Sequence, residues 1–262
     1  MVYWHEIFFL LLSFILFGCT NNDDDLGCAK DNDDRLTVLE ARQHVIAHRG
    51  SWKLHDLPQN SRASFYEALS LQLFGTEFDV HQTKDGFLVI NHDYYIGEKE
   101  ISNSSYEELK LHTLSNGEVV PTLEEFLSIY KSQQSEVNLF IELKQCVVEK
   151  VVNLVNEYDI QDKVFYISFS ESYCNQIVTL GLGKYVLYLG GDLSPNEAAN
   201  RGYSGISYNE SVFSQYVEWL QEAKRIGLNV CIWPVDDVQK MKYYINMGVH
   251  ISTDNPTFYK TL

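Results

Sequence analysis

The segment Thr76-Glu77-Phe78-Asp79-Val80-His81 alternates polar and apolar side chains, a pattern that indicates a β-strand. Residues i and i+2 of a strand face the same side, so its two carboxylates point together. The same reasoning applies to the predicted strand Val137–Leu143, whose carboxylate is followed two positions later by a lysine. The ends of the two strands therefore carry four charged side chains: Glu77, Asp79, Glu142 and Lys144.

Strand-like and helix-like runs alternate along the rest of the chain, which is typical of a parallel α/β fold. Eight strands are predicted: Val45–His48, Thr76–His81, Val137–Leu143, Val164–Phe169, Tyr185–Leu189, Gly205–Tyr208, Val230–Val235 and Val249–Ser252. Helices are predicted between them: Asn60–Leu73, one that starts at Pro121 with a Thr122/Glu125 capping box, Val147–Tyr158, Glu171–Leu180, Pro195–Asn200, Val212–Ile226 and Asp236–Met247.

Two segments after the second strand fall outside this alternation. Phe87–Asn91 is predicted to extend that strand or to pair with it as a hairpin, and Tyr94–Val120 is predicted to be irregular and polar.

Eight strand–helix units close a single (β/α)8 TIM barrel, whose active site lies at the carboxyl ends of the strands. We therefore predict one barrel domain over residues 36–262. The alternative, an open doubly wound sheet, should carry a glycine-rich phosphate loop, which this sequence lacks.

Carboxylates at neighbouring strand ends repel one another and are costly to bury without a compensating cation. We predict that Glu77, Asp79 and Glu142 bind one divalent cation, Mg²⁺ or Ca²⁺, because both ions prefer oxygen ligands. The alternative is that the same carboxylates form ion pairs with Arg49 and Lys144.

Two histidines accompany these charges, in His48-Arg49-Gly50 and Asn91-His92-Asp93. A histidine near a strand end is commonly a hydrogen-bonded structural residue. Cleavage of a phosphodiester, however, needs one group that takes a proton from the nucleophile and another that protonates the leaving oxygen, and imidazole suits both tasks near neutral pH. Since both histidines accompany cations and carboxylates, His48 and His92 are the candidate acid–base pair.

Composition limits the possible partners. The chain has 262 residues, 45% of them hydrophobic, and a formal net charge of −16. It is long enough to bury one large core. The acidic balance argues against nucleic acid or an anionic membrane surface as a partner, because there is no basic stripe to displace counterions. A small anionic substrate held by a few local cations remains compatible with it.

The N-terminus has the features of a targeting signal. Residues 7–17 form an uncharged apolar run of the length of a signal-peptide core rather than a spanning helix. Leu16-Phe17-Gly18-Cys19 resembles the bacterial lipobox, although the usual basic residues are missing before the apolar run. We expect residues 1–18 to be a lipoprotein signal peptide and Cys19 to be lipidated, which anchors the protein in the bacterial cell envelope. An ordinary secretory signal is the alternative.

Residues 19–35 are predicted to be a disordered tether, because six aspartates and little apolar content cannot offset the entropy of ordering. The acidic stretch also resembles the surface-export signal of Bacteroidetes lipoproteins, and a plain solvated linker explains it equally well. Beyond Cys19 and Cys28 the chain has three cysteines, without the spacing of a zinc site or redox pair, and they are expected to be buried free thiols: Cys146, Cys174 and Cys231.

Taken in order, the motifs resemble the glycerophosphodiester phosphodiesterase family. The resemblance extends from about Val45 to Pro256 and rests on His48-Arg49-Gly50, Pro58-Gln59-Asn60-Ser61, Glu77-Phe78-Asp79-Val80, Lys84-Asp85-Gly86, Asn91-His92-Asp93, Pro121-Thr122-Leu123-Glu124-Glu125, Ile141-Glu142-Leu143-Lys144, Trp233 and Thr253-Asp254-Asn255-Pro256. It implies a barrel enzyme of the phospholipase C-like phosphodiesterase type that hydrolyses glycerophosphodiesters to glycerol 3-phosphate and an alcohol.

The resemblance also implies a role for each matching residue. His48 and His92 would be the acid–base pair, and Glu77, Asp79 and Glu142 the metal ligands. Arg49 and Lys144 would neutralise the phosphoryl oxygens, and Trp233 would form a wall of the glycerol pocket. The metal would act as a Lewis acid and as a template for in-line attack.

The sequence departs from the family pattern at two places. The family usually has Pro-Glu-Asn-Thr where this chain has Pro58-Gln59-Asn60-Ser61, and Trp-Thr-Val-Asn where it has Trp233-Pro234-Val235-Asp236. Because three other carboxylates are present, we expect Gln59 to position neighbouring groups rather than to replace a metal ligand.

Two other functions remain open on this sequence. One is a phospholipase D-like enzyme that acts on lysophospholipid or sphingolipid head groups through the same histidines and metal ligands. The other is a surface lipoprotein that binds phosphodiesters without turnover.

Overall fold

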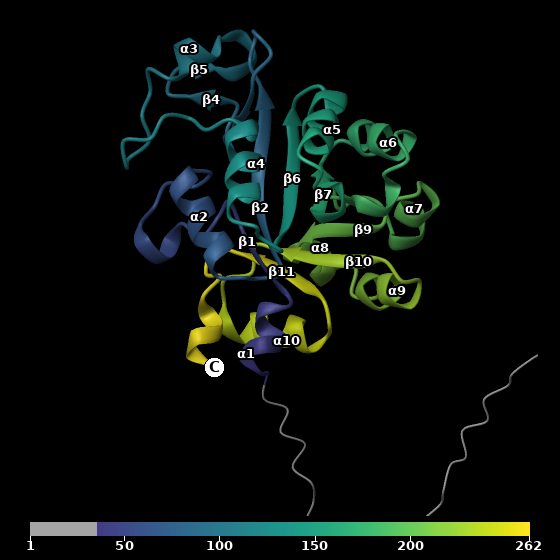
Figure 1. The fold of residues 1–262 in the computed structure, drawn as a ribbon. Helices are drawn as coiled ribbons and strands as arrows, with labels where there is room; N and C mark the ends of the chain where they lie inside the picture. Colours follow the sequence, from purple (N-terminus) through teal and green to yellow (C-terminus); the bar gives the residue numbers. More distant parts are fainter. Residues whose placement is uncertain (1–35) are drawn as a thin grey trace, which may run out of the picture. The chain divides into compact units, whose positions relative to one another are not determined.

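Eight parallel strands form a closed barrel in the computed structural model, which describes residues 36–262 (Figure 1). Each strand pairs with the next, and β1 pairs with both β11 and β2, which closes the ring. The predicted TIM barrel is therefore confirmed. Its strands are β1 (Val45–Ala47), β2 (Gly75–Gln82), β6 (Asn138–Gln145), β7 (Val164–Ser168), β8 (Val186–Tyr188), β9 (Gly205–Asn209), β10 (Asn229–Trp233) and β11 (His250–Thr253).

Helices surround the strands on the outside, as Figure 1 shows. They are α1 (Val38–Arg42), α2 (Arg62–Ser70), α4 (Leu123–Ser132), α5 (Val148–Glu157), α6 (Glu171–Thr179), α7 (Pro195–Asn200), α8 (Glu210–Gln215), α9 (Trp219–Arg225) and α10 (Val238–Asn246). Helix α4 begins with the predicted capping box, in which Thr122 and Glu125 each satisfy the other's backbone amide.

The structure differs from prediction at the single helix expected over Val212–Ile226, which is two helices, α8 and α9. Tyr216 leaves the helical conformation, with φ −119° and ψ 72°, and its ring stacks on Trp219 at 4.1 Å. The apolar spacing is continuous through this region, so periodicity alone does not reveal the break.

The segment predicted to be irregular also contains regular structure. Strand β3 (Leu88–Ile90) pairs antiparallel with β2, as a hairpin partner. It is followed by a two-stranded ribbon of β4 (Tyr95–Ile96) and β5 (Lys99–Glu100) and by helix α3 (Tyr106–Leu109). The segment that contains β3, β4, β5 and α3 has its own apolar cluster: Val89, Ile96, Ile101, Leu109 and Val120. These apolar residues are too far apart in the sequence to produce a local periodic signal.

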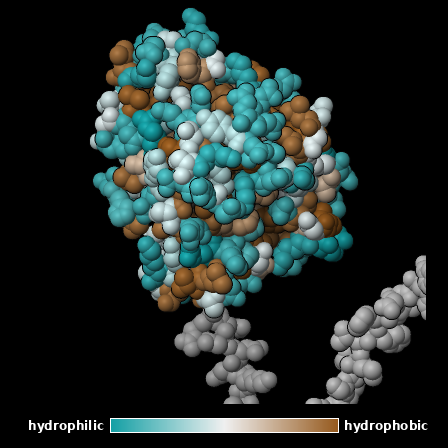
Figure 2. Space-filling model, viewed as in Figure 1, coloured by the Kyte–Doolittle hydropathy of each residue, from teal (hydrophilic) through white to brown (hydrophobic). Residues whose placement is uncertain are grey.

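Apolar side chains fill two layers of the barrel. The larger one lies between strands and helices, and a smaller one fills the barrel interior with Ile46, Phe140, Ile167, Leu187, Leu189 and Cys231. Because side chains alternate along a strand, Phe140 shares a face with Glu142 and places apolar atoms beneath the carboxylates. On the outer surface, polar and apolar residues are interspersed (Figure 2).

The three cysteines expected to be buried free thiols, Cys146, Cys174 and Cys231, are buried, and none forms a disulfide within residues 36–262. Within residues 36–262, no helix combines the length and the apolar character needed to cross a membrane. The signal peptide, the lipidated Cys19 and the tether predicted from the sequence lie outside the described residues.

Candidate active site

A sharp turn after β1 begins the site. Arg49 and Gly50 both have left-handed backbone conformations, with φ +55° and +82°. A Cβ at Gly50 would lie 2.6 Å from the Ser64 hydroxyl and 2.8 Å from the Ser64 backbone, so the turn requires glycine. The turn aims the Arg49 amide at the barrel, where it donates a 2.9 Å hydrogen bond to Glu77 Oε2.

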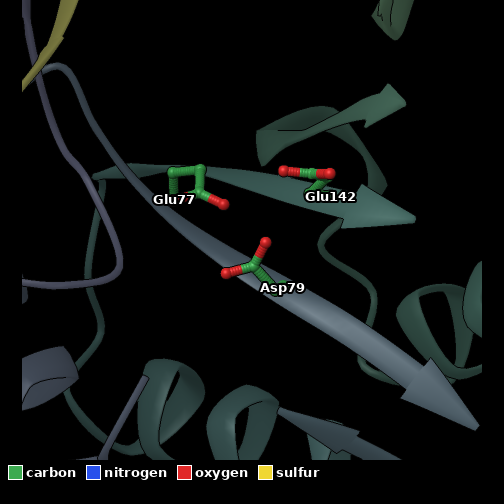
Figure 3. A group of neighbouring side chains, drawn as sticks. All are labelled: Glu77, Asp79 and Glu142. Atoms are coloured by element: carbon green, nitrogen blue, oxygen red, sulfur yellow. The ribbon is translucent and has the colours of Figure 1, made fainter. Parts of the chain in front are cut away.

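Three carboxylates on two adjacent strands point toward one another, as Figure 3 shows. Glu77 and Asp79 extend from β2 and Glu142 from β6, and Asp79 is directly opposite Glu142 in the parallel register. One oxygen of each residue lies within 4.8 Å of the others. All three residues are buried. The side chains that the sequence predicted to point together therefore do so.

Burial raises the pKa of Glu77 well above its usual value, and repulsion by Asp79 and Glu142 adds to the effect. Burial and Asp79 likewise raise the pKa of Glu142 to about 7, against the pull of Lys144. For Asp79, burial is outweighed by Lys144 and by a hydrogen bond from Asn60, so its pKa is lowered. The protein's own cations thus stabilise the ionised form of only part of the cluster.

Two cations flank the carboxylates. Lys144 Nζ lies 2.6 Å from Glu142 Oε1 and 3.2 Å from Asp79 Oδ1. Arg49 Nε lies 3.8 Å from Asp79 Oδ2, and its Nη1 donates a 2.7 Å hydrogen bond to the side chain of Gln59. The ion pairs considered as an alternative to metal binding are thus present. Two cations nevertheless face three carboxylates, and Glu77 Oε1 is buried without a hydrogen-bond partner among residues 36–262. This set of oxygen donors fits a divalent cation.

Both candidate histidines face this cluster. His48 Nε2 lies 4.0 Å from Glu77 Oε2, and its Nδ1 is 2.8 Å from Asp254 Oδ1. His92 Nδ1 is 2.8 Å from the neighbouring Asp93. Burial lowers the pKa of His92, opposed by Asp79 and Asp93, so its neutral form is favoured. A neutral imidazole can accept a proton near neutral pH.

One cavity at the barrel mouth joins most of these groups. It is lined by seven of the predicted site residues: His48, Arg49, Glu77, His92, Glu142, Lys144 and Trp233. Asp79 is buried behind this lining. The remaining wall is formed by apolar and small polar side chains: Ile46, Phe140, Ile167, Phe169, Leu189, Ser207, Cys231 and Ser252.

The sequence analysis gave no role to three contributors to the site, although two of them, Asn60 and Asp254, lie in motifs that carry the family resemblance. Asn60 donates a 2.8 Å hydrogen bond to Asp79, Phe169 packs edge-on against Trp233 at 5.6 Å, and Asp254 contacts His48. Phe169 follows β7 directly, so its place at a strand end was an available signal. His81, which ends the predicted strand of Glu77 and Asp79, is fully buried, and its Nε2 contacts the His92 carbonyl oxygen at 3.3 Å.

Comparison with known proteins agrees with this arrangement. The model of the glycerophosphoryl diester phosphodiesterase family matches residues 48–257. The chain belongs to this family. It is 31% identical over 233 residues to a glycerophosphodiester phosphodiesterase from Caldanaerobacter subterraneus, covering 81% of this chain and 94% of that protein. The resemblance read from the motifs is confirmed, and so is the enzyme class, a phosphoric diester hydrolase.

Solved structures share the fold. A glycerophosphodiester phosphodiesterase from Parabacteroides distasonis is 36% identical, with a TM-score of 0.78 over 83% of this chain and 95% of that one. A phosphodiesterase from Oleispira antarctica, solved with its product sn-glycerol 3-phosphate, is 22% identical, with a TM-score of 0.71 over 86% of this chain and 98% of that one.

Proposed function

We propose that this chain hydrolyses glycerophosphodiesters to glycerol 3-phosphate and an alcohol, with one divalent cation, Mg²⁺ or Ca²⁺, and a pair of catalytic histidines. The observation that carries the proposal is the convergence of three buried carboxylates, two cations and two histidines around one cavity. The product bound to the Oleispira enzyme, which has the same fold, supports the same substrate class.

Glu77, Asp79 and Glu142 would hold the cation, because their oxygens lie close together and their charge exceeds that of the nearby cations. A divalent cation bound there supplies Lewis-acid polarisation of a phosphoryl oxygen. Arg49 and Lys144 line the same cavity and bring positive charge to the remaining phosphoryl oxygens.

Trp233 and Phe169 form an apolar wall of the same cavity. The Trp233 Nε1–H donates a 2.8 Å hydrogen bond to the Ser207 carbonyl oxygen, which fixes the ring. This wall suits the carbon atoms of a glycerol group.

The two histidines would carry out the two proton transfers of the reaction. In the hydrolysis a nucleophilic oxygen forms a bond to phosphorus, and the bond from phosphorus to the alcohol oxygen breaks. One imidazole accepts the proton of the nucleophile, and the other donates a proton to the departing alkoxide. The half-buried His48 and the more exposed His92 both line the cavity, so each can reach a different oxygen of a bound phosphodiester.

The substrate assignment is tested by incubating the purified protein with glycerophosphocholine, glycerophosphoethanolamine and glycerophosphoglycerol, with and without chelator. We expect release of glycerol 3-phosphate that stops in chelator and returns with Mg²⁺ or Ca²⁺. Turnover that persists in strong chelator would contradict the metal. Preferential release of a head group from lysophosphatidylcholine would favour the phospholipase D-like alternative.

We also propose that Cys19 carries a lipid that anchors the barrel in the bacterial cell envelope behind the tether of residues 19–35. The support is the lipobox-like Leu16-Phe17-Gly18-Cys19 and the apolar run before it. Cys19→Ala should move the protein from the membrane to the soluble fraction, measured by fractionation and immunoblotting. Unchanged membrane association of the variant would point to an uncleaved anchor.

A further inference from the structure

His48 has a second partner on the side of its ring away from the carboxylate cluster. Its Nδ1 lies 2.8 Å from Asp254 Oδ1, in the segment that follows β11, 206 residues away in sequence. The opposite nitrogen, Nε2, is the one directed at Glu77, 4.0 Å away. The ring therefore lies between two carboxylates, with Nδ1 at hydrogen-bond distance from Asp254 and Nε2 facing Glu77.

Asp254 is itself held on several sides. Trp52 Nε1 donates a 3.3 Å hydrogen bond to the oxygen that contacts His48, and Lys53 Nζ lies 3.9 Å from the other oxygen. The backbone amide of Asp254 donates a 2.8 Å hydrogen bond to Asp236, which also accepts one from the Thr253 hydroxyl. The hydrogen bonds fix both the main chain and the carboxylate of Asp254, whereas Lys53 adds only a longer contact between charges.

The donor and acceptor roles of the two side chains determine which atom of the His48–Asp254 pair carries the proton. Burial pushes the pKa of Asp254 up, but its hydrogen bond to His48 and the charges of His48 and Lys53 outweigh this and lower it. The carboxylate is thus ionised near neutral pH and can only accept. The proton of the hydrogen bond must therefore belong to His48 Nδ1, so in the neutral form of the ring Nε2 would carry the free lone pair.

The other histidine lacks such a support. His92 contacts Asp93, the next residue in the same loop, whose side chain is 79% exposed. A carboxylate that accessible to water holds a ring less firmly than one fixed by several hydrogen bonds. His48 is therefore the histidine whose carboxylate partner is itself fixed in place by other contacts.

We propose that Asp254 is a positioning residue that holds His48 as the Nδ1–H tautomer, with Nε2 directed at the substrate cavity. The proposal rests on the proposed function, since it assigns His48 a proton-transfer role. Asp254 does not line the cavity and does not belong to the carboxylate cluster. It therefore acts through His48, and its loss should lower kcat more than it raises KM.

The first test is kinetic. Asp254→Ala should lower kcat for glycerophosphocholine by roughly 10²–10³-fold, within the range of general acid–base catalysis, and change KM by less than about threefold. Combined with His48→Ala, it should add almost nothing to the loss caused by His48→Ala alone, because both changes remove the same function. A loss in the double variant equal to the product of the two single losses would overturn the proposal.

Lys53→Met is the matched control. It removes the neighbouring charge, leaves the His48–Asp254 hydrogen bond in place and involves a half-exposed side chain. We expect its kcat to stay within about threefold of the wild type. A loss as large as that of Asp254→Ala would show that local charge, rather than the hydrogen bond, is what matters, and would overturn the proposal.

The second test is independent of activity. In ¹⁵N NMR spectra of histidine-labelled protein, neutral His48 should carry its proton on Nδ1, and in folded Asp254→Ala it should shift towards the Nε2–H form that free histidine prefers. Neutral wild-type His48 protonated on Nε2 would overturn the proposal even if the variant fails to fold. If instead the wild type turns over no glycerophosphodiester, the proposed function fails, while the tautomer result still decides the role of Asp254.

Discussion

His48 follows β1 and His92 lies in the loop after β3. Both line the same cavity, so their loss should affect chemistry more than folding. A dialkyl phosphate has a poor leaving group and depends on a proton donor. We expect His48→Ala and His92→Ala each to lower kcat by roughly 10²–10⁴-fold, the range of general acid–base catalysis, with little change in Tm. Steady-state kinetics and thermal melts of the same preparations measure both effects.

A substrate with an activated leaving group separates the two roles. A nitrophenyl phosphodiester needs no acid for its leaving group, so it should restore turnover of the variant that lost the acid and not of the other. If neither variant is restored, the division of roles is wrong. Near-normal turnover of the natural ester by both variants would refute the catalytic assignment itself.

Gln59 is one of the residues at which this chain departs from the family pattern, and it accepts a hydrogen bond from Arg49 at 2.7 Å. A glutamate there would neutralise the arginine and place a further negative charge near the phosphate. We expect Gln59→Glu to raise KM by roughly threefold to tenfold, the equivalent of about 1 kcal/mol, with a smaller change in kcat. An unchanged KM would show that Arg49 does not contact the substrate's phosphate.

At the scale of an element, the turn after β1 depends on Gly50. A side chain there meets both a positive φ and the Ser64 backbone. We expect Gly50→Ala to lower the free energy of unfolding by roughly 1–3 kcal/mol and to reduce activity, because the Arg49 amide bonded to Glu77 is displaced.

Gly117→Ala is the matched control for this turn. Gly117 has φ +85°, and no atom of the part of the chain that the structure describes lies within 4 Å of a Cβ built on it. It therefore carries the conformational cost of a positive φ without the steric contact. Urea unfolding of the two variants compares them, and equal losses of stability would contradict a role for the contact with Ser64.

Over the whole molecule, the carboxylate cluster links stability to pH and metal. The pKa of Glu142 is about 7 in the folded protein, above its usual value of 4.5. A raised pKa contributes stability that is complete below pH 4.5 and is lost as the pH rises through about 7. Glu77, whose pKa is also raised, acts in the same direction. Without metal, the cluster therefore weakens the fold as the pH rises.

A divalent cation should reverse this loss, because it binds the deprotonated carboxylates. At a concentration about a hundred times its Kd we expect Mg²⁺ or Ca²⁺ to raise Tm by about 5 °C or more at pH 8 and far less at pH 5. Differential scanning fluorimetry measures this, and Glu77→Gln should abolish the increase. A cation-induced rise in Tm as large at pH 5 as at pH 8 would count against binding by these carboxylates.

Much of the molecule follows from local patterns in the sequence. Eight strands, the capping box of α4 and the shared face of Glu77 and Asp79 depend on side-chain alternation and on hydrogen bonds between near neighbours, so the chain alone determined them. The position of the candidate site followed too, because every parallel strand of a barrel ends at the same rim.

Only the tertiary structure decided the remaining features. Barrel closure joins His48 to Asp254 across 206 residues, and no local pattern encodes that contact. The break between α8 and α9 occurs where Tyr216 stacks on Trp219, which also packs against Tyr208 of β9, and the raised pKa of Glu142 depends first on burial. Each arises from the surroundings that the closed barrel imposes on a side chain, whereas sequence periodicity records only which face of an element that side chain occupies.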